Sequence, residues 1–276
     1  MILKIKHHTN YQYPTPIFPE PQHLYFTPLS RGYLNIIDFK LEVNPKPTGN
    51  AIRIDIEGNP YNQCWFNELT DHLEINVEIE LELDQLNQFD FLVEEAPKTE
   101  MNKAVDLYLK DQLSLKKESV EWLKTIENND PISFIGSLCQ SIHDKWDHTT
   151  SYDTELLDPN KCFDFKAASC RDLAWMMIQM LRHVGYPARF VSGYSYNPEL
   201  TGHELHAWVE VWVHGAGWIG VDPSSGLFIT EFYIPIAASY HPTNTLPVQG
   251  SYRGSAPSEL TTSIDLQVKK RQELTN

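Results

Sequence analysis

The chain has 276 residues, enough for one large domain or two of ordinary size. Its composition, 41% hydrophobic and 21% charged, is that of a soluble globular protein and excludes a disordered or fibrous chain. The formal net charge is -15, whereas surfaces that bind nucleic acid or anionic membranes carry clustered Lys and Arg. We therefore expect neither a nucleic acid nor a membrane among the partners.

The N-terminus and the cysteines bear on the cellular compartment. Residues 1–8 lack the apolar stretch of a secretory signal, and no later run approaches the ~18 apolar residues of a membrane span. These features predict a cytoplasmic protein. The four cysteines are too few for a disulfide scaffold and include no C-x-x-C pair for structural zinc, so at least one can be reactive. They are Cys64, Cys139, Cys162 and Cys170.

The first part of the chain has the pattern of β-strands. Between His72 and Leu83 apolar and polar residues alternate, as they do on a strand with one buried face. Further strand candidates are residues 2–13, 34–43 and 51–57. Together these segments predict an antiparallel β-sandwich-like domain at residues 1–95.

From Pro97 onward the pattern becomes helical. Within residues 132–146 the apolar residues recur at steps of three and four, which places Cys139 on a buried helix face. Trp146 is on the same face, and although its indole N–H could hold an oxyanion, this position favours the core. We therefore expect a boundary near residues 92–100 and a second domain at residues 96–276.

Cys170 stands at a predicted helix start. Ser169 is a good N-cap, and Asp172 three positions later completes a capping-box pattern for a helix that runs to about Val184. A thiol in the first helical turn lies at the positive end of the helix dipole, which favours the thiolate, and its own N–H could hold an oxyanion. The alternative is a buried structural cysteine that happens to open a helix. Cys162 has the weaker case, since its sequence is loop-like and has no cap.

Two strands after this helix predict a hairpin. Residues 205–214 alternate, with Ala207 on one face and His206, Trp208 and Glu210 on the other. Residues 218–222 return as a partner strand after a glycine-containing turn, and they end at Asp222. His206 and Asp222 therefore stand at the same end of one hairpin.

The register of this hairpin decides whether His206 and Asp222 can touch. Facing residues in an antiparallel pair have position numbers with a constant sum, and a slip of one residue turns a side chain to the other face. A sum of 430, which a three-residue loop or a bulge gives, places Asp222 on the face of His206. A sum of 431 turns it away. Gly215 and Gly217 suit the first case, but the sequence leaves both registers open.

Taken together, Cys170, His206 and Asp222 match a nucleophile, its base and the residue that orients the base. Singly, His206 could be a solvated residue at a strand edge and Asp222 a turn former. A metal site at His203 and His206 is disfavoured, because residues three apart on a strand face opposite sides.

The remaining aromatic and histidine candidates have plainer interpretations. Trp208, Trp212 and Trp218 line a cleft or pack in the core, and His143, His148 and His241 are surface or structural residues.

The motifs that carry this chemistry resemble those of bacterial transglutaminase-like proteins. The matching segments are Ser-Cys-Arg-Asp-Leu-Ala (169–174), Gly-Tyr-Pro-Ala-Arg-Phe-Val-Ser-Gly-Tyr (185–194), His-Ala-Trp-Val-Glu-Val-Trp-Val (206–213) and Gly-Trp-Ile-Gly-Val-Asp-Pro-Ser (217–224). The N-terminal strands resemble the β domain that often precedes this core, and residues 247–254 resemble its C-terminal segment. Ser224 departs from the family pattern, in which Thr often follows Asp-Pro.

The resemblance implies an α+β fold, with the N-terminal antiparallel β-sandwich-like domain followed by a papain-like or transglutaminase-like cysteine-protease core. It implies that Cys170 is the nucleophile, His206 its base and Asp222 the orienting residue of an enzyme that cleaves or transfers amide acyl groups through a thioester. A peptide or protein amide is the expected substrate, with no cofactor and no metal. The alternative is a non-catalytic peptide- or protein-binding module on the same fold. The sequence leaves open the substrate, the choice of hydrolysis or transamidation, and the oligomeric state.

Overall fold

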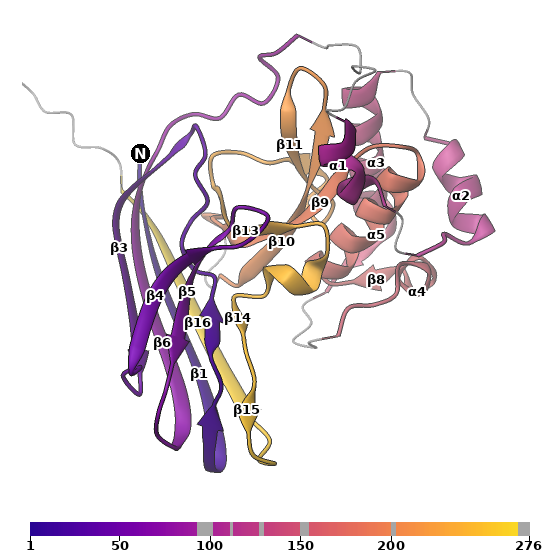
Figure 1. Cartoon of the computed structure of the whole chain (residues 1–276). Coiled ribbons are helices and arrows are strands. Elements are labelled where there is room, and N and C mark those ends of the chain that lie inside the picture. Colours follow the sequence, from indigo (N-terminus) through magenta and orange to yellow (C-terminus); the bar gives the residue numbers. More distant parts are fainter. Residues whose placement is uncertain (93–101, 111–112, 127–129, 150–154, 200–202, 270–276) are drawn as a thin grey trace, which may run out of the picture.

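The computed structural model describes residues 1–92, 102–110, 113–126, 130–149, 155–199 and 203–269. Two antiparallel sheets face each other in a sandwich, and beside them a third sheet carries helices on one side (Figure 1). This arrangement confirms the predicted α+β fold class. Most of the predicted boundary at 92–100 lies outside the described residues, and the division at residues 95 and 96 stays a prediction.

The sandwich buries the alternating apolar residues predicted for its strands. Leu73, Ile75 and Val77 of one sheet and Leu24 and Cys64 of the other share one core, and these side chains are at most 3% exposed. Burial of this kind is the main driving force for folding. The first sheet contains β1 (Ile2–Pro19), β3 (Leu34–Asn44), β6 (Thr70–Leu83), β15 (Tyr252–Arg253) and β16 (Glu259–Lys269). The second contains β2 (Gln22–Leu24), β4 (Gly49–Ile54), β5 (Pro60–Trp65) and β14 (Val248–Gln249).

Strands from both ends of the chain build this sandwich. β16 runs antiparallel to β1 over eleven paired positions, from Ile2 opposite Lys269 to Gln12 opposite Glu259. In Figure 1 the yellow C-terminal strand therefore lies beside the indigo N-terminal one. After forming the third sheet, the chain thus returns to the first sheet and adds a strand to it.

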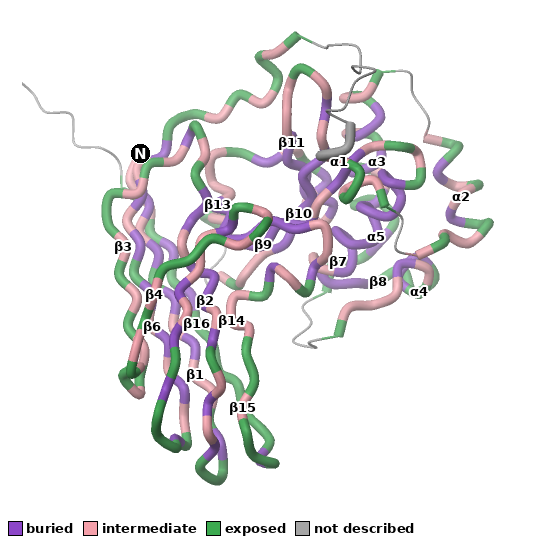
Figure 2. The backbone as a smooth tube through the Cα atoms, in the orientation of Figure 1, coloured by how far each residue is buried: buried purple, intermediate pink, exposed green. Residues whose placement is uncertain are grey.

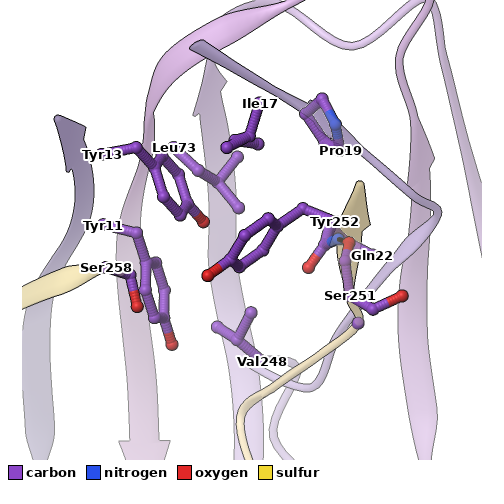
Figure 3. Close-up of a pocket in the computed structure, with 11 residues that line it drawn as sticks. Tyr11, Tyr13, Ile17, Pro19, Gln22, Leu73, Val248, Ser251, Tyr252 and Ser258 are labelled. Atoms are coloured by element: carbon purple, nitrogen blue, oxygen red, sulfur yellow. Dashed lines mark hydrogen bonds between the residues drawn. The ribbon is translucent and has the colours of Figure 1, made fainter. Parts of the chain in front are cut away.

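A cavity of about 220 Å³ marks the contact between the C-terminal segment and β1. Tyr11 and Tyr13 of β1 and Tyr252 of β15 lie around it (Figure 3). The Tyr13 and Tyr252 rings pack edge to face, with centroids 5.0 Å apart, and the Tyr252 hydroxyl donates to the Ala256 carbonyl. Burial raises the pKa of Tyr11 to about 12. These contacts attach the returning segment to the sandwich.

The third sheet is the scaffold of the second half of the chain. Its strands lie in the order β12 (Leu227–Phe228), β11 (Gly217–Asp222), β10 (Leu205–Val213), β9 (Ala188–Ser195) and β13 (Tyr233–Ser239). The helices are α1 (Asn102–Leu109), α2 (Lys117–Lys124), α3 (Pro131–Lys145), α4 (Pro159–Phe165), α5 (Cys170–His183) and the 3-10 turn η1 (Pro242–Thr245). β7 (Asp147–His148) and β8 (Ala167–Ala168) form a short parallel pair. Among the described helices, none is long and apolar enough to cross a membrane.

Both faces of this sheet are covered. Ala207, Val209 and Val211 of β10 pack in the same core as α5, whose buried residues form much of the interior (Figure 2). On the other face Trp208 packs with Leu29, which precedes β3. This confirms the predicted division of the β10 side chains between two faces, and it places Trp208 in the core.

Polar contacts also join the sheet to the sandwich. Asn59 is 1% exposed, and its side chain exchanges two hydrogen bonds with the backbone of Ala238 in β13, at 2.8 and 3.0 Å. The buried carboxylate of Glu210 in β10 forms ion pairs with the guanidinium groups of Arg31 and Arg189. Buried polar groups are costly unless paired, so these contacts fix how the two parts of the chain meet.

Of two predictions for the region around α4, the one for Cys162 is wrong and the one for Trp146 is confirmed. The loop predicted around Cys162 is wrong, because Cys162 lies inside α4, where Asp158 accepts from the amides of Asn160 and Lys161. Asp158 followed by Pro159 is an N-cap and N1 signal that the sequence analysis missed. The core position predicted for Trp146 is confirmed, and its indole N–H donates to the Cys162 carbonyl over 3.0 Å.

Replacement of Asn59 by Ala tests the contact between the sandwich and the third sheet. The substitution leaves the Ala238 N–H and C=O buried without partners, so we expect the free energy of unfolding to fall by about 1–3 kcal/mol for each group. Urea denaturation followed by tryptophan fluorescence measures it. Asn35→Ala, at an exposed position of β3, is the control and should change stability by less than about 0.5 kcal/mol. Equal stability of the two variants would contradict this view of the contact.

Candidate active site

Cys170 is the first residue of α5, as the sequence predicts. The Ser169 hydroxyl accepts from the Asp172 amide, and the Asp172 carboxylate accepts from both the amide and the hydroxyl of Ser169. Asp172 also accepts from the Leu157 amide over 2.9 Å, which ties the helix start to the preceding segment. The N–H of Cys170 is one of the first four in the helix, which have no partner within the helix. The thiol and this N–H therefore lie at the positive end of the helix.

The hairpin has the register that brings His206 and Asp222 together. Val209 pairs with Val221 and Val213 with Gly217, so facing position numbers sum to 430. The three-residue loop needs left-handed backbone at Gly215 (φ 89°), and Gly217 also has positive φ (78°). His206 Nε2 lies 2.8 Å from Asp222 Oδ2, so the register is the one that the Cys170–His206–Asp222 hypothesis requires.

Asp222 is held by more groups than the sequence analysis identified. Its Oδ2 also accepts from the Tyr233 hydroxyl over 2.8 Å, and its Oδ1 accepts from the amide and hydroxyl of Ser224 over 2.9 and 2.7 Å. Burial favours the neutral acid, but the charge of His206 and the hydrogen bonds from His206, Ser224 and Tyr233 outweigh it. They hold the pKa of Asp222 well below its usual range. Asp222 is therefore a carboxylate although it is only 1% exposed.

The environment of Cys170 favours its thiolate. Burial is the largest influence and opposes ionisation, but hydrogen bonds from His148 and His206, the charge of His206 and the Ala207 backbone together outweigh it. The pKa of the Cys170 thiol falls to about 6. Burial also opposes the charged form of His206, yet Asp222 and Cys170 raise the pKa of His206 well above its ordinary value. Since Nε2 contacts Asp222, Nδ1 is the ring nitrogen left for Cys170.

His148 is exposed, as expected of a surface residue, but it is also a site residue that the sequence analysis missed. β7 pairs in parallel with β8, so that His148 lies opposite Ala168, two residues before Cys170. The Thr149 amide continues the pairing by donating to the Ala168 carbonyl over 2.9 Å. The hydrogen bond to Cys170 raises the pKa of His148. Two-residue strands leave no periodicity in the sequence, so no local signal could have placed this ring.

The three side chains open into a polar cavity of about 560 Å³. Its walls carry His148, Thr149, Ser195, Asn197 and Ser224. Trp212 and Trp218 are not among its lining residues, and their rings pack against each other edge to face. The cavity is thus lined by groups that hydrogen-bond with water or with a peptide backbone.

The described residues contain no cluster of three or more metal-ligating side chains. His203, considered in the sequence as a ligand, contacts the Asn197 carbonyl and stacks on Tyr196. Of the other histidines, His143 bonds to the Ser224 carbonyl, and the side chain of His241 caps η1.

Two protein-family models match the chain, one in the region of the third sheet and its helices and one in the N-terminal strands. A family model described as the transglutaminase-like superfamily matches residues 120–223, which include Cys170, His206 and Asp222. A second, described as the bacterial transglutaminase-like N-terminal region, matches residues 3–82. The chain therefore contains a transglutaminase-like core, preceded by a region that is similar to the N-terminal region of bacterial transglutaminase-like proteins.

Individual relatives match only part of the chain. The chain is 31% identical to an uncharacterised protein of Mycobacterium leprae over 35% of its own length and 36% of that protein. It is 41% identical to the protein-glutamine gamma-glutamyltransferase of Pseudomonas aeruginosa over 22% of its own length and 10% of that enzyme. The chain thus spans about a third and a tenth of the length of these two relatives.

A solved structure matches the fold over nearly the whole chain. It is described as a "putative cysteine protease" from Cytophaga hutchinsonii. The TM-score is 0.73, with 99% of this chain and 92% of that chain covered, at 17% sequence identity. At this identity the match shows a shared fold and nothing further.

Alkylation of Cys170 at different pH values tests its environment. A thiol with a pKa of about 6 is a thiolate above that pH, so the iodoacetamide rate at Cys170 should level off by about pH 7.5, whereas an ordinary thiol has its midpoint near ~8.5. The rate is read from the modified peptide by mass spectrometry. His148→Gln removes a charged donor and should move the midpoint upward. An unchanged midpoint in this variant would show that His148 does not act on the thiol.

Proposed function

We propose that the protein is a cysteine-nucleophile enzyme that acts on amide bonds of peptides or proteins through Cys170, His206 and Asp222. One observation carries the proposal: a thiol at a helix N-terminus, with a lowered pKa, lies beside an imidazole whose other nitrogen contacts a buried carboxylate. Structural cysteines in the same chain differ in this respect, since burial raises the pKa of Cys139 and Cys162.

Acylation begins when the Cys170 thiolate attacks the carbonyl carbon of the amide. The C–N bond then breaks, and His206 gives a proton from Nδ1 to the leaving amine. Asp222 keeps Nε2 protonated and stabilises the imidazolium, while Tyr233 and Ser224 fix the carboxylate. The products are the free amine and a thioester on Cys170.

The oxyanion of the tetrahedral intermediate needs donors beside the sulfur. The Cys170 N–H is the first, since it lies at the helix start without an intrahelical partner. We assign the second to the His148 ring, which hydrogen-bonds to the thiol and whose raised pKa favours the protonated donor. In this role His148 stabilises the resting thiolate and then the oxyanion.

The thioester is released by water or by an amine. His206, neutral after protonating the leaving group, takes a proton from the attacking molecule as this bonds to the thioester carbon and the C–S bond breaks. The polar walls of the cavity admit water, which supports hydrolysis as the main outcome. An amine substrate would compete with water and give transamidation.

The names of two similar proteins support chemistry on amide bonds. They do not decide whether water or an amine takes the acyl group. One is a protein-glutamine gamma-glutamyltransferase and the other is described as a "putative cysteine protease". A non-catalytic peptide-binding module on the same fold is the alternative, and the lowered pKa of Cys170 argues against it.

We place the enzyme in the cytoplasm, a reducing compartment in which thiols persist.

Substitution of the three site residues tests the proposal. Cys170→Ala should abolish acylation by p-nitrophenyl acetate, and His206→Ala should lose nearly all of it. Asp222→Asn should lower the acylation rate by roughly 10²- to 10³-fold, less than in a serine enzyme, because a cysteine–histidine pair is already ionised at rest. Stopped-flow absorbance measures the rates, and intact-mass spectrometry detects the acyl-enzyme.

Cys139→Ala and Cys162→Ala are the matched controls, since both thiols are buried and neither is among the residues that line the cavity. They should acylate at the rate of the native protein. Full acylation of Cys170→Ala, or its loss in Cys162→Ala, would identify another nucleophile. The yield of amide relative to acid with added methylamine then gives the partition between transamidation and hydrolysis.

A further inference from the structure

A second cavity adjoins the polar one across His206. Its volume is about 230 Å³, and it lies between β9, β10, η1 and β16. The two cavities share Arg171, Glu204, Leu205 and His206 among their lining residues. A substrate that reaches Cys170 therefore lies next to the mouth of the second cavity.

The walls of this second cavity are apolar. They carry Leu156, Leu205, Leu246, Pro247 and Leu260, and we call the cavity the leucine pocket. Leu246 is 41% exposed and Leu260 is 50% exposed, although other apolar residues of β16 such as Leu266 are buried. Water around these exposed side chains would be released when an apolar group covers them.

The hydroxyl groups of the pocket are already satisfied within the protein. Ser192 donates to the Thr245 carbonyl over 2.6 Å, and Thr245 donates to the Pro242 carbonyl over 2.8 Å. Thr243 bonds to His241, and Thr262 donates to the His8 carbonyl. The walls therefore present methyl groups and offer a ligand no unpaired hydroxyl, which disfavours a polar occupant.

Polarity changes along the length of the two cavities. Charged residues, Arg171 and Glu204, stand only at the end that the leucine pocket shares with the polar cavity. This gradient suits a peptide whose backbone lies among the polar groups near Cys170 while one side chain enters the apolar end. The volume is below the roughly 300–1,000 Å³ typical of small-molecule sites, so it suits a single side chain.

We infer that the leucine pocket is a specificity site that binds a large apolar side chain, of the leucine or phenylalanine class, from the substrate segment that flanks the reacting carbonyl. The inference rests on the proposed function and adds the substrate class. It also gives the β-sandwich a direct part in selection, because β16 supplies Leu260 and Thr262. A glycine or a charged side chain in this position leaves the leucines uncovered or buries a charge.

Capped dipeptide coumarin amides test the inference with Gly, Leu, Phe or Glu at each of the two positions before the reacting carbonyl. We expect kcat/KM for Leu or Phe to exceed that for Gly or Glu by at least about tenfold at one position. Leu260→Glu, at a half-exposed position, should abolish this preference. Leu69→Glu, on an exposed loop of the sandwich, is the control and should keep both the preference and the native rate with p-nitrophenyl acetate.

A binding measurement separates this inference from the proposed function. Calorimetry with the Cys170→Ala variant should show tighter binding of acetyl-Leu-Gly-amide than of acetyl-Glu-Gly-amide, and Leu260→Glu should remove the difference. No apolar preference in either assay, or an unchanged preference in Leu260→Glu, would overturn the leucine pocket as a specificity site. If the peptides bind with this preference but Cys170 is never acylated, the proposed function fails and the pocket stands.

Discussion

The register of the hairpin between β10 and β11 is the constraint on which the candidate site depends. Each residue added to or removed from its loop would turn Asp222 to the opposite face of the sheet. The loop can be three residues long because Gly215 and Gly217 accept positive φ. With this register, the Asp222 carboxylate meets His206, and the charge of His206 in turn stabilises the Cys170 thiolate at the helix start. Backbone geometry thus sets the electrostatics of the site.

The β-sandwich takes part in this arrangement through packing and hydrogen bonds. Tyr33, in the segment before β3, donates to the Tyr233 carbonyl over 2.7 Å, and the Tyr233 hydroxyl donates to Asp222. The Glu210 cluster with Arg31 and the exchange between Asn59 and Ala238 fix the sandwich against the same sheet. Because β16 also lines the leucine pocket, the sandwich both supports Asp222 and shapes the space beside His206.

The sequence predicted the parts of the site that local patterns encode. The capping residues around Cys170 and the alternation in β6 and β10 reflect hydrogen bonding and burial within single elements, so helix and strands were predicted at the positions where they occur. Contacts between distant segments were not predictable in this way. His148 reaches Cys170 through a two-residue strand pair, Tyr233 reaches Asp222 from an edge strand, and β16 joins β1 across the whole chain. The α4 helix was missed for another reason, since the Asp158-Pro159 start signal was overlooked.

We propose that Cys170 and His206 form a thiolate–imidazolium pair at rest, held by Asp222. Nitrogen-15 NMR of the histidine rings tests it most directly, because the two ring nitrogens of an imidazolium have nearly equal shifts and those of a neutral imidazole differ widely. At pH 7.5 we expect both nitrogens of His206 to be protonated in the native protein, and we expect Asp222→Asn to reduce this protonation. A neutral His206 ring in the native protein at pH 7.5 would rule out a resting thiolate–imidazolium pair.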